Sequence, residues 1–494
     1  MSEQRRILLI NPTITSRRSA RFPLAVMSLA GSLAGKYATG IIDGNVDRDF
    51  IATTLRTMSE TKVDAVGVTV MGGPQLPTAI AVSKAVRARF PAVPIIWGGY
   101  YPTICPDPSI TAPYVDYVVR GQGEDALSEL LAAIFAGERA QLDSIAGLSW
   151  RRAGEVVHNG NRTFSTAGLA TMLPFDRIEK PSQYLSRTYL GQRTTGYQAA
   201  LGCRFRCTFC GVARMFNGKT ALPAAARLEQ DLRFFKQQLG VDAIQFYDHN
   251  FFDREVDMVP LLEILAKHEL PWWCFARSDA LLNLSERSWA LVRKSRLRMA
   301  YIGAESPSDW LLHDVRKGTR SDQTLAVVEK CRGQGVVPEL SFMLAPPEDP
   351  EGETEKTFEF IRLIKRLHPA TEIMLYIYTP LPSSRLMQLR DHDGRPVEFP
   401  TTADEWARPE WVDYWCHQDA PWLGERLRRR ILDFTTVLGC RFPTVTDIRS
   451  PSWAKSTLSA LASWRYRYQK YHRPWELDVS KKLVRLWDPR VSSL

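Results

Sequence analysis

Three cysteines within one short stretch constrain this chain more than any other feature. Cys203, Cys207 and Cys210 are spaced C-x3-C-x2-C, so they must lie in a single loop. A cubane iron–sulfur cluster held entirely by protein needs four cysteine thiolates. Three neighbouring thiolates therefore predict a 4Fe–4S cluster in which one iron is open to another ligand, and these residues are its expected metal ligands.

Zinc and a disulfide framework explain the spacing less well. A structural zinc site needs a fourth Cys or His at short range, and the nearest following histidine is His249. Eight cysteines in 494 residues is not the density of a secreted disulfide scaffold. The five other thiols are expected to be buried or incidental: Cys105, Cys274, Cys331, Cys416 and Cys440.

Apolar runs alternate with helical stretches in the first 140 residues, which predicts an α/β, Rossmann-like domain with a doubly wound parallel sheet. Ligands of such sheets bind beyond the carboxyl ends of the strands. Glycines gather at those ends: Gly72, Gly73, Gly98, Gly99, Gly121 and Gly123. No G-x-G-x-x-G follows the first strand, which argues against a dinucleotide, and any single glycine pair can instead mark a tight turn.

A second strand–helix alternation begins at the cysteine loop. Six such units over residues 189–395 predict a partial (β/α)6 barrel, with its active site at the carboxyl ends of the strands. Residues 141–188 are expected to form a linker that includes a hairpin. Residues 396–494 are expected to form a helical cap domain.

The cysteine motif, with Phe209 before its last cysteine, resembles that of the radical S-adenosylmethionine (SAM) superfamily. Residues 97–103 (WGGYYPT) and 118–124 (VVRGQGE) resemble the cobalamin-binding domain that precedes many of those barrels. Residues 302–306 (IGAES) and 316–319 (RKGT) are similar to cobalamin-type members, which include methyltransferases and anaerobic Mg-protoporphyrin ester cyclases. The resemblance implies three cofactors: the 4Fe–4S cluster, SAM and cobalamin.

The resemblance also implies binding residues at the strand ends. For SAM they are Phe209, Asp248, Arg277, Glu305, Ser341 and Tyr378. For cobalamin they are Asn11, Thr13, Thr69, Met71, Gly72, Gly98, Gly99, Tyr100, Thr103, Gly121, Gly123 and Glu124. Residues 1–157 contain no histidine, and Thr13 stands about where related domains carry a cobalt-ligating His. Cobalamin is therefore expected to bind without a histidine ligand.

The activity implied by the resemblance is methylation of an unactivated carbon. A deoxyadenosyl radical would abstract a hydrogen from a small-molecule substrate, and methylcobalamin would supply the methyl group. An external donor of the flavodoxin or ferredoxin type would provide electrons to an enzyme expected to be a monomer. Two alternatives stay open: an oxidative cyclase or other non-methylating rearrangement, and an RNA- or peptide-modifying enzyme that docks through a basic tail.

The C-terminal region carries most of the net charge. Residues 423–494 contain 15 Lys/Arg and 6 Asp/Glu, against a net charge of +10 for the whole chain, and eight of the 14 tryptophans follow residue 405. A solvated cap, a substrate screen, a membrane contact and a nucleic-acid face all fit this pattern, the last least well. The apolar run Ile7–Ile10 is too short for a signal peptide, and no run is long enough to span a membrane. A cytoplasmic enzyme is expected.

Overall fold

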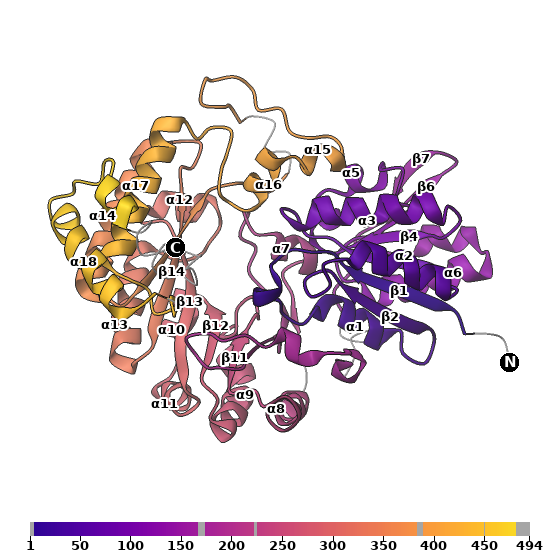
Figure 1. The fold of residues 1–494 in the computed structure, drawn as a ribbon, viewed down its shortest axis with the longest axis horizontal. Coiled ribbons are helices and arrows are strands. Elements are labelled where there is room, and N and C mark those ends of the chain that lie inside the picture. Colours follow the sequence, from indigo (N-terminus) through magenta and orange to yellow (C-terminus); the bar gives the residue numbers. More distant parts are fainter. Residues whose placement is uncertain (1–3, 166–172, 222–224, 383–388, 449, 481–494) are drawn as a thin grey trace.

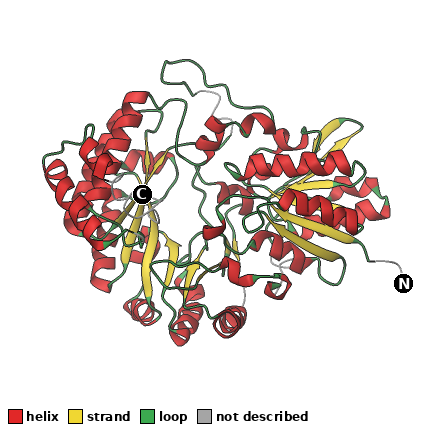
Figure 2. Ribbon diagram, in the orientation of Figure 1, coloured by secondary structure: helices red, strands yellow, loops and turns green. Residues whose placement is uncertain are grey.

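The computed structural model describes residues 4–165, 173–221, 225–382, 389–448 and 450–480. Two α/β halves lie side by side, the N-terminal half at the right and the barrel at the left (Figure 1). Helices cover both faces of the N-terminal sheet and the outside of the barrel (Figure 2). The mixed α/β class and the helical C-terminal region predicted from the sequence are confirmed.

The N-terminal sheet has seven strands in the order β2-β1-β3-β4-β5-β6-β7. The first five are parallel and the last two antiparallel. They are β1 (Arg6–Asn11), β2 (Ala38–Asp43), β3 (Ala65–Thr69), β4 (Ile95–Gly98), β5 (Tyr117–Val119), β6 (Leu148–Arg152) and β7 (Glu155–His158). Residues 7–10 are buried on both faces of the sheet, which explains their unbroken apolar run. The hairpin β6–β7 extends this sheet past the expected boundary at residue 140.

Six α-helices belong to the N-terminal half: α1 (Leu24–Ser32), α2 (Phe50–Glu60), α3 (Gln75–Arg89), α4 (Tyr100–Ile104), α5 (Pro106–Ile110) and α6 (Glu124–Ala136). The helix α4 begins directly after the Gly98–Gly99 turn, and α6 begins directly after Gly123. The glycine-rich turns therefore join strand ends to helix starts, which places them at the ligand-binding edge of the sheet.

The barrel sheet has six parallel strands in the order β15-β14-β13-β12-β11-β8. They are β8 (Thr194–Tyr197), β11 (Ala243–Phe246), β12 (Trp272–Ala276), β13 (Leu297–Glu305), β14 (Val337–Leu344) and β15 (Glu372–Ile377). A separate two-stranded ribbon pairs β9 (Leu201–Gly202) with β10 (Thr220–Ala221) across the cysteine loop. The predicted partial six-unit barrel is confirmed by this open parallel sheet.

The barrel helices and the C-terminal helices follow the same chain order. Those around the barrel are α7 (Gly211–Phe216), α8 (Ala225–Leu239), α9 (Glu255–His268), α10 (Ser278–Leu282), α11 (Glu286–Lys294), α12 (Asp309–Asp314), α13 (Ser321–Gln334) and α14 (Pro350–Leu367). The C-terminal ones are α15 (Ala403–Trp406), α16 (Pro409–Trp415), α17 (Glu425–Arg441) and α18 (Ser452–Arg467). None of the helices in the described ranges is long and apolar enough to cross a bilayer.

A shared apolar core joins the two halves. Phe22 of the N-terminal half stacks on Tyr184 at 4.7 Å between ring centroids and meets Phe175 edge-on at 5.1 Å. Phe175 packs in turn against Phe235 of α8. The connecting segment, expected as a linker, therefore fills the junction with aromatic side chains and fixes one half against the other.

The C-terminal segment returns to the N-terminal half at α15 and α16, drawn in orange above the junction in Figure 1. Asp404 forms an ion pair with Lys84 at 2.5 Å and accepts a hydrogen bond from the Tyr114 hydroxyl at 2.9 Å. Trp415 packs edge-on against Tyr100 and Tyr101. The segment that carries α15 and α16 therefore packs against the N-terminal half.

Candidate active site

The cysteine loop connects β9 to α7 and is held by backbone hydrogen bonds. The Thr208 N–H donates to the Val315 carbonyl at 3.0 Å, and the Cys210 N–H donates to the Cys207 carbonyl at 3.2 Å. Cys207 is buried, whereas Cys203 and Cys210 are half-buried. None of the eight cysteines, all of which lie in the described ranges, forms a disulfide. The loop therefore presents three free thiols at the mouth of the barrel.

A buried arginine lies beside these thiols. The Arg277 guanidinium lies 3.9 Å from the Cys207 sulfur and 3.6 Å from the centroid of the Phe205 ring. It also donates to the Lys317 carbonyl at 2.7 Å and pairs with Asp279 at 2.9 Å. Arg277, expected at the SAM site, therefore braces the loop that carries the cysteines and can offset the charge of thiolates.

Burial raises the pKa of Cys210 to about 11, and nearby thiols add to the rise. Burial also raises the pKa of Cys203, while an N–H from Phe205 opposes the shift. Three thiolates in this site would therefore need cationic compensation, which iron supplies when bound. Within the described ranges no three His, Cys, Asp or Glu side chains converge as ligands of one ion would. A cubane does not require this, because each cysteine binds a different iron.

A buried ion pair lies at the carboxyl end of β13. The Lys317 ammonium is 2.7 Å from a Glu305 carboxylate oxygen, and both residues are less than a tenth exposed. Glu305 has a φ of 63°, an uncommon backbone conformation for a non-glycine residue. A Cβ at Gly303 would overlap the side-chain ends of both Glu305 and Lys317, so a larger residue there would have to displace the pair. The IGAES and RKGT segments thus meet in one charged pair.

Three further residues expected at the SAM site lie near this strand end. Phe209 packs against the small apolar cluster of Leu311, Val315, Met343 and Tyr378. Ser341 is buried on β14 and hydrogen-bonds Tyr301. Phe209 and Tyr378 are therefore brought together, whereas Ser341 faces the barrel interior. Their roles in SAM binding stay predictions.

Asp248, also expected to hold SAM, has another task in the structure. It is 1% exposed, and its two carboxylate oxygens accept the Ala199 and Ala200 N–H groups at 3.0 and 2.5 Å. Burial raises its pKa to about 7. The carboxyl group therefore fixes the chain that enters the cysteine loop, and its role in SAM binding stays a prediction.

A cavity of about 1040 Å³ lies between the two halves. One wall is the carboxyl edge of the N-terminal sheet. The expected cobalamin residues in this wall are Thr69, Met71, Gly98, Gly99, Tyr100, Gly121, Gly123 and Glu124. The other wall includes Val212 and Met215 of α7, which begins directly after Cys210. A ligand on the glycine edge (Gly98, Gly99, Gly121 and Gly123) would therefore face α7, the helix that follows the cysteine loop.

Gly98 tests whether this cavity suits a large ligand. A Cβ there would meet only Val119, at 3.5 Å or more, so the protein itself leaves room for a side chain. Gly99 differs, because its φ is +99° and a Cβ would lie 3.0 Å from the Thr69 hydroxyl. The fold thus requires glycine at Gly99 but not at Gly98. A flat group resting on the sheet edge would account for Gly98, as cobalamin would.

Four expected cobalamin residues do not line the cavity. Asn11 donates to Asp43 at 2.9 Å, and Thr13 donates to the Gly44 carbonyl at 2.8 Å. Gly72 lies under Trp415, whose ring a Cβ would overlap. Thr103 donates to the Gly99 carbonyl at 2.7 Å and accepts the Gly121 N–H at 2.8 Å. Thr103 therefore ties two cavity turns together, and the structure gives the other three packing or turn roles.

The two walls touch at Tyr100. Its ring packs so closely on Gly211 that a Cβ at Gly211 would overlap the hydroxyl and ring atoms. The Gly211 backbone hydrogen-bonds this hydroxyl, while burial raises the pKa of Tyr100 well above its ordinary value. Gly211 follows Cys210 directly, so the first turn of α4 is in contact with the cysteine loop.

His249 was not expected among the cavity residues. It lines the cavity and packs against Phe216 at 5.5 Å between ring centroids. Burial lowers the pKa of its imidazole to about 4, so the ring is neutral, and its Nδ1 is buried without a hydrogen-bond partner. The absence of histidine before residue 158 thus did not exclude histidine from the cavity. Its position directly after Asp248, at a strand end, was the available signal.

An aromatic lining inside the barrel was also not expected. Tyr247, Trp273, Phe275 and Tyr301 form a continuous set of ring contacts with centroids 4.7–6.3 Å apart. Burial raises the pKa of neighbouring Glu339 to about 7, and Glu339 accepts the Trp273 indole N–H at 2.9 Å. The alternation of strand side chains was the signal, since these residues occupy same-face positions on adjacent strands.

Comparison with known families agrees with this division. The B12 binding domain family matches residues 11–131, and the Radical SAM superfamily matches residues 197–361. The chain is a radical SAM enzyme with a B12-binding domain. Each match contains the wall or loop described for that half: the glycine edge in the first and the three cysteines in the second. Cobalamin, SAM and the 4Fe–4S cluster are the cofactors of such an enzyme.

Individual relatives are distant. An uncharacterised methyltransferase of Pyrococcus horikoshii is 24% identical over 371 residues, covering 74% of this chain and 78% of the relative. The anaerobic magnesium-protoporphyrin IX monomethyl ester cyclase of Rubrivivax gelatinosus is 25% identical, covering 78% and 69%. The solved structure of the radical SAM methyltransferase TsrM from Kitasatospora setae, with cobalamin and a 4Fe–4S cluster bound, superposes with a TM-score of 0.64 at 17% identity, covering 93% and 99%. That likeness shows a common fold.

Proposed function

We propose that this enzyme is a cobalamin-dependent radical SAM C-methyltransferase that acts on an unactivated carbon of a small molecule. The observation that carries the proposal is the cavity shared by the glycine edge and α7. It would hold a corrin with one face toward the cysteine loop. A relative named as a methyltransferase matches 74% of the chain, which supports the same activity.

Three sets of residues would hold the three cofactors. Cys203, Cys207 and Cys210 would hold the cluster, the Glu305–Lys317 pair would meet the charged groups of SAM, and the glycine edge would carry the corrin. When bound, the cluster and SAM supply a hydrogen-abstracting radical, and cobalamin carries the methyl group. Arg277 keeps the cysteine loop in place, and the Tyr100–Gly211 contact holds the two walls at a fixed separation.

The substrate is proposed to enter the barrel mouth over the aromatic lining. Tyr247, Phe275 and Tyr301 are half-buried, so parts of their rings stay accessible. Aromatic faces bind apolar or ring-containing groups and exclude water from reacting carbon centres. Electrons are proposed to come from a flavodoxin- or ferredoxin-type donor.

The experiment uses SAM that carries a trideuterated methyl group. Reconstituted enzyme with cobalamin and dithionite is incubated with an extract of host cells that lack the gene. Extract metabolites that gain a trideuteromethyl group with wild-type enzyme, and not with Cys207→Ala, support the methyltransferase. Deoxyadenosine formation with a new product that carries no label would instead support the oxidative cyclase suggested by the Rubrivivax relative.

A further inference from the structure

The outward face of α18 carries four large exposed side chains. Trp453, Leu461, Trp464 and Tyr468 are 56%, 39%, 50% and 62% exposed. At about 100° per residue these positions fall within an arc of roughly 80° on the helix and its last turn. A single exposed apolar residue is ordinary, but an aligned row marks an interaction surface.

The opposite face of α18 already has its packing partners. Leu458 and Ala462 are buried in a cluster with Val437 and Cys440 of α17. The outward row is therefore not needed to attach the helix to the protein. In Figure 1 the helix lies at the far left edge, at the opposite end of the molecule from the N-terminal half. None of the four residues of the row lines the cavity between the halves.

The charges around the row are mainly positive. The helix has no acidic residue. Arg467, which holds its guanidinium 5.6 Å from the Tyr468 ring, is exposed, as are Lys470 and Arg473 in the segment that follows. Arg465 is buried against Glu476 and does not contribute. Within residues 450–480, all of which the structure describes, Asp478 is the one exposed acidic residue. The three exposed Arg and Lys side chains therefore outnumber the exposed carboxylates there.

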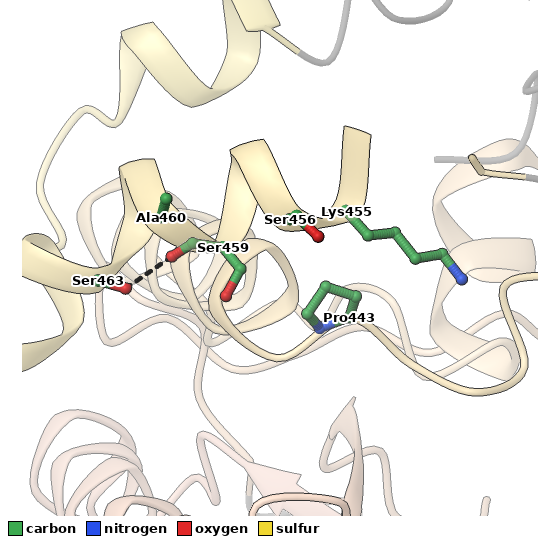
Figure 3. Close-up of a pocket in the computed structure, with 6 residues that line it drawn as sticks. All are labelled: Pro443, Lys455, Ser456, Ser459, Ala460 and Ser463. Carbon is green, nitrogen blue, oxygen red and sulfur yellow. Dashed lines mark hydrogen bonds between the residues drawn. The ribbon is translucent and has the colours of Figure 1, made fainter. Parts of the chain in front are cut away.

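A shallow hollow of about 450 Å³ runs along the same helix (Figure 3). Its lining is Pro443, Lys455, Ser456, Ser459, Ala460 and Ser463. The Ser463 hydroxyl donates to the Ser459 carbonyl at 2.7 Å, and the Ser459 hydroxyl donates to the Arg441 carbonyl at 2.8 Å. Two of the three serine hydroxyls in the lining are therefore satisfied within the protein.

We propose that the row Trp453, Leu461, Trp464 and Tyr468 is a docking surface for an anionic lipid bilayer. Trp and Tyr favour the boundary between headgroups and acyl chains. Exposed Arg and Lys beside them attract anionic headgroups. A helix that presents one apolar arc with flanking cations lies in the plane of that boundary. The protein would rest on the membrane through α18 with its N-terminal half projecting away.

The test is co-sedimentation of the full-length protein with vesicles. Wild type binds vesicles of equimolar phosphatidylcholine and phosphatidylglycerol, binds phosphatidylcholine alone more weakly, and is released by salt because exposed charges are screened. The double variant Trp453→Ser/Trp464→Ser binds the anionic vesicles at least about tenfold more weakly. The matched control is Trp310→Ser on α12, an indole of similar exposure (44%) away from α18, and it binds as wild type does.

Circular dichroism and dithionite-driven SAM cleavage in solution establish that the double variant is folded. Equal vesicle binding by wild type and the double variant overturns the proposal. So does a wild type that ignores anionic vesicles and forms a dimer that the double variant does not form, since a second copy would then cover the row. Neither readout depends on methyl transfer, so this proposal stands or falls separately from the proposed function.

Discussion

Placing a large side chain at Gly98 should block cobalamin while leaving the fold intact. Gly98 ends β4, and a Cβ there meets only Val119 at 3.5 Å, which is ordinary contact. In Gly98→Phe the ring would extend into the 1040 Å³ cavity, where the sheet edge is open. Gly98→Ala supplies the matched control, because its methyl group fits and a lost glycine adds about 0.4–1 kcal/mol of stability.

Ligand linkage gives the magnitude. A ligand present at 100 times its Kd stabilises the folded state by about 2.7 kcal/mol. If Gly98→Phe weakens cobalamin binding a hundredfold, the same concentration adds only about 0.4 kcal/mol. The assay is urea unfolding of the protein with and without hydroxocobalamin. Wild type and Gly98→Ala should show the larger increment, and Gly98→Phe should show the smaller one with an unchanged ligand-free unfolding free energy.

Gly99→Ala shows what structural damage would look like. Its φ of +99° and the 3.0 Å approach to Thr69 should cost about 1–3 kcal/mol without any ligand. If Gly98→Phe loses stability to the same degree in the ligand-free protein, the open edge has been misjudged. If it keeps the full cobalamin increment, the corrin does not rest on this edge.

Three further predictions concern the barrel. Cys207→Ala should abolish cluster absorbance and SAM cleavage, whereas Cys274→Ala should keep both, as judged by visible spectra and deoxyadenosine release. Glu305→Gln should lose about 3–5 kcal/mol of unfolding free energy because it leaves the buried Lys317 ammonium unpaired. Adding Lys317→Met should recover most of that loss by urea unfolding but not SAM affinity by calorimetry, and recovery of both would make the pair purely structural. Glu339 has a folded-state pKa of about 7, above its ordinary value, so wild type should lose up to about 3 kcal/mol as pH rises from about 4.5 to 7. Glu339→Gln should flatten that part of a thermal-unfolding pH profile, and an unchanged slope would contradict the pKa.

The strands and their succession along the chain could be predicted from the sequence because parallel sheets are buried on both faces. Their residues read as unbroken apolar runs, as in Ile7–Ile10, and each run became a strand. The cysteine loop could be predicted just as directly, because three cysteines spaced so closely must lie in one loop. The hairpin Leu148–His158 was foreseen, but its pairing with β5 was not, because edge pairing depends on distant partners.

The side-chain roles were harder to predict for a physical reason. A polar residue at a strand end can face a ligand or satisfy backbone groups, and the sequence does not distinguish the two. Asp248 serves the backbone of residues 199 and 200, and Thr103 links two turns. Gly72 fits beneath Trp415, a residue from the other end of the chain. Such roles depend on long-range packing, which no local pattern encodes.

The packing of the C-terminal segment on the N-terminal half has a consequence for folding during synthesis. Asp404 is 320 residues from its partner Lys84, and Trp415 covers the turn at Gly72. During synthesis the N-terminal sheet therefore emerges long before the residues that close over this side of it. Domains generally fold as units as they emerge, so the sheet would stand uncovered while the barrel is being translated. If cobalamin binds at the glycine edge as proposed, that interval would leave it an open route to this edge before the two halves are locked together.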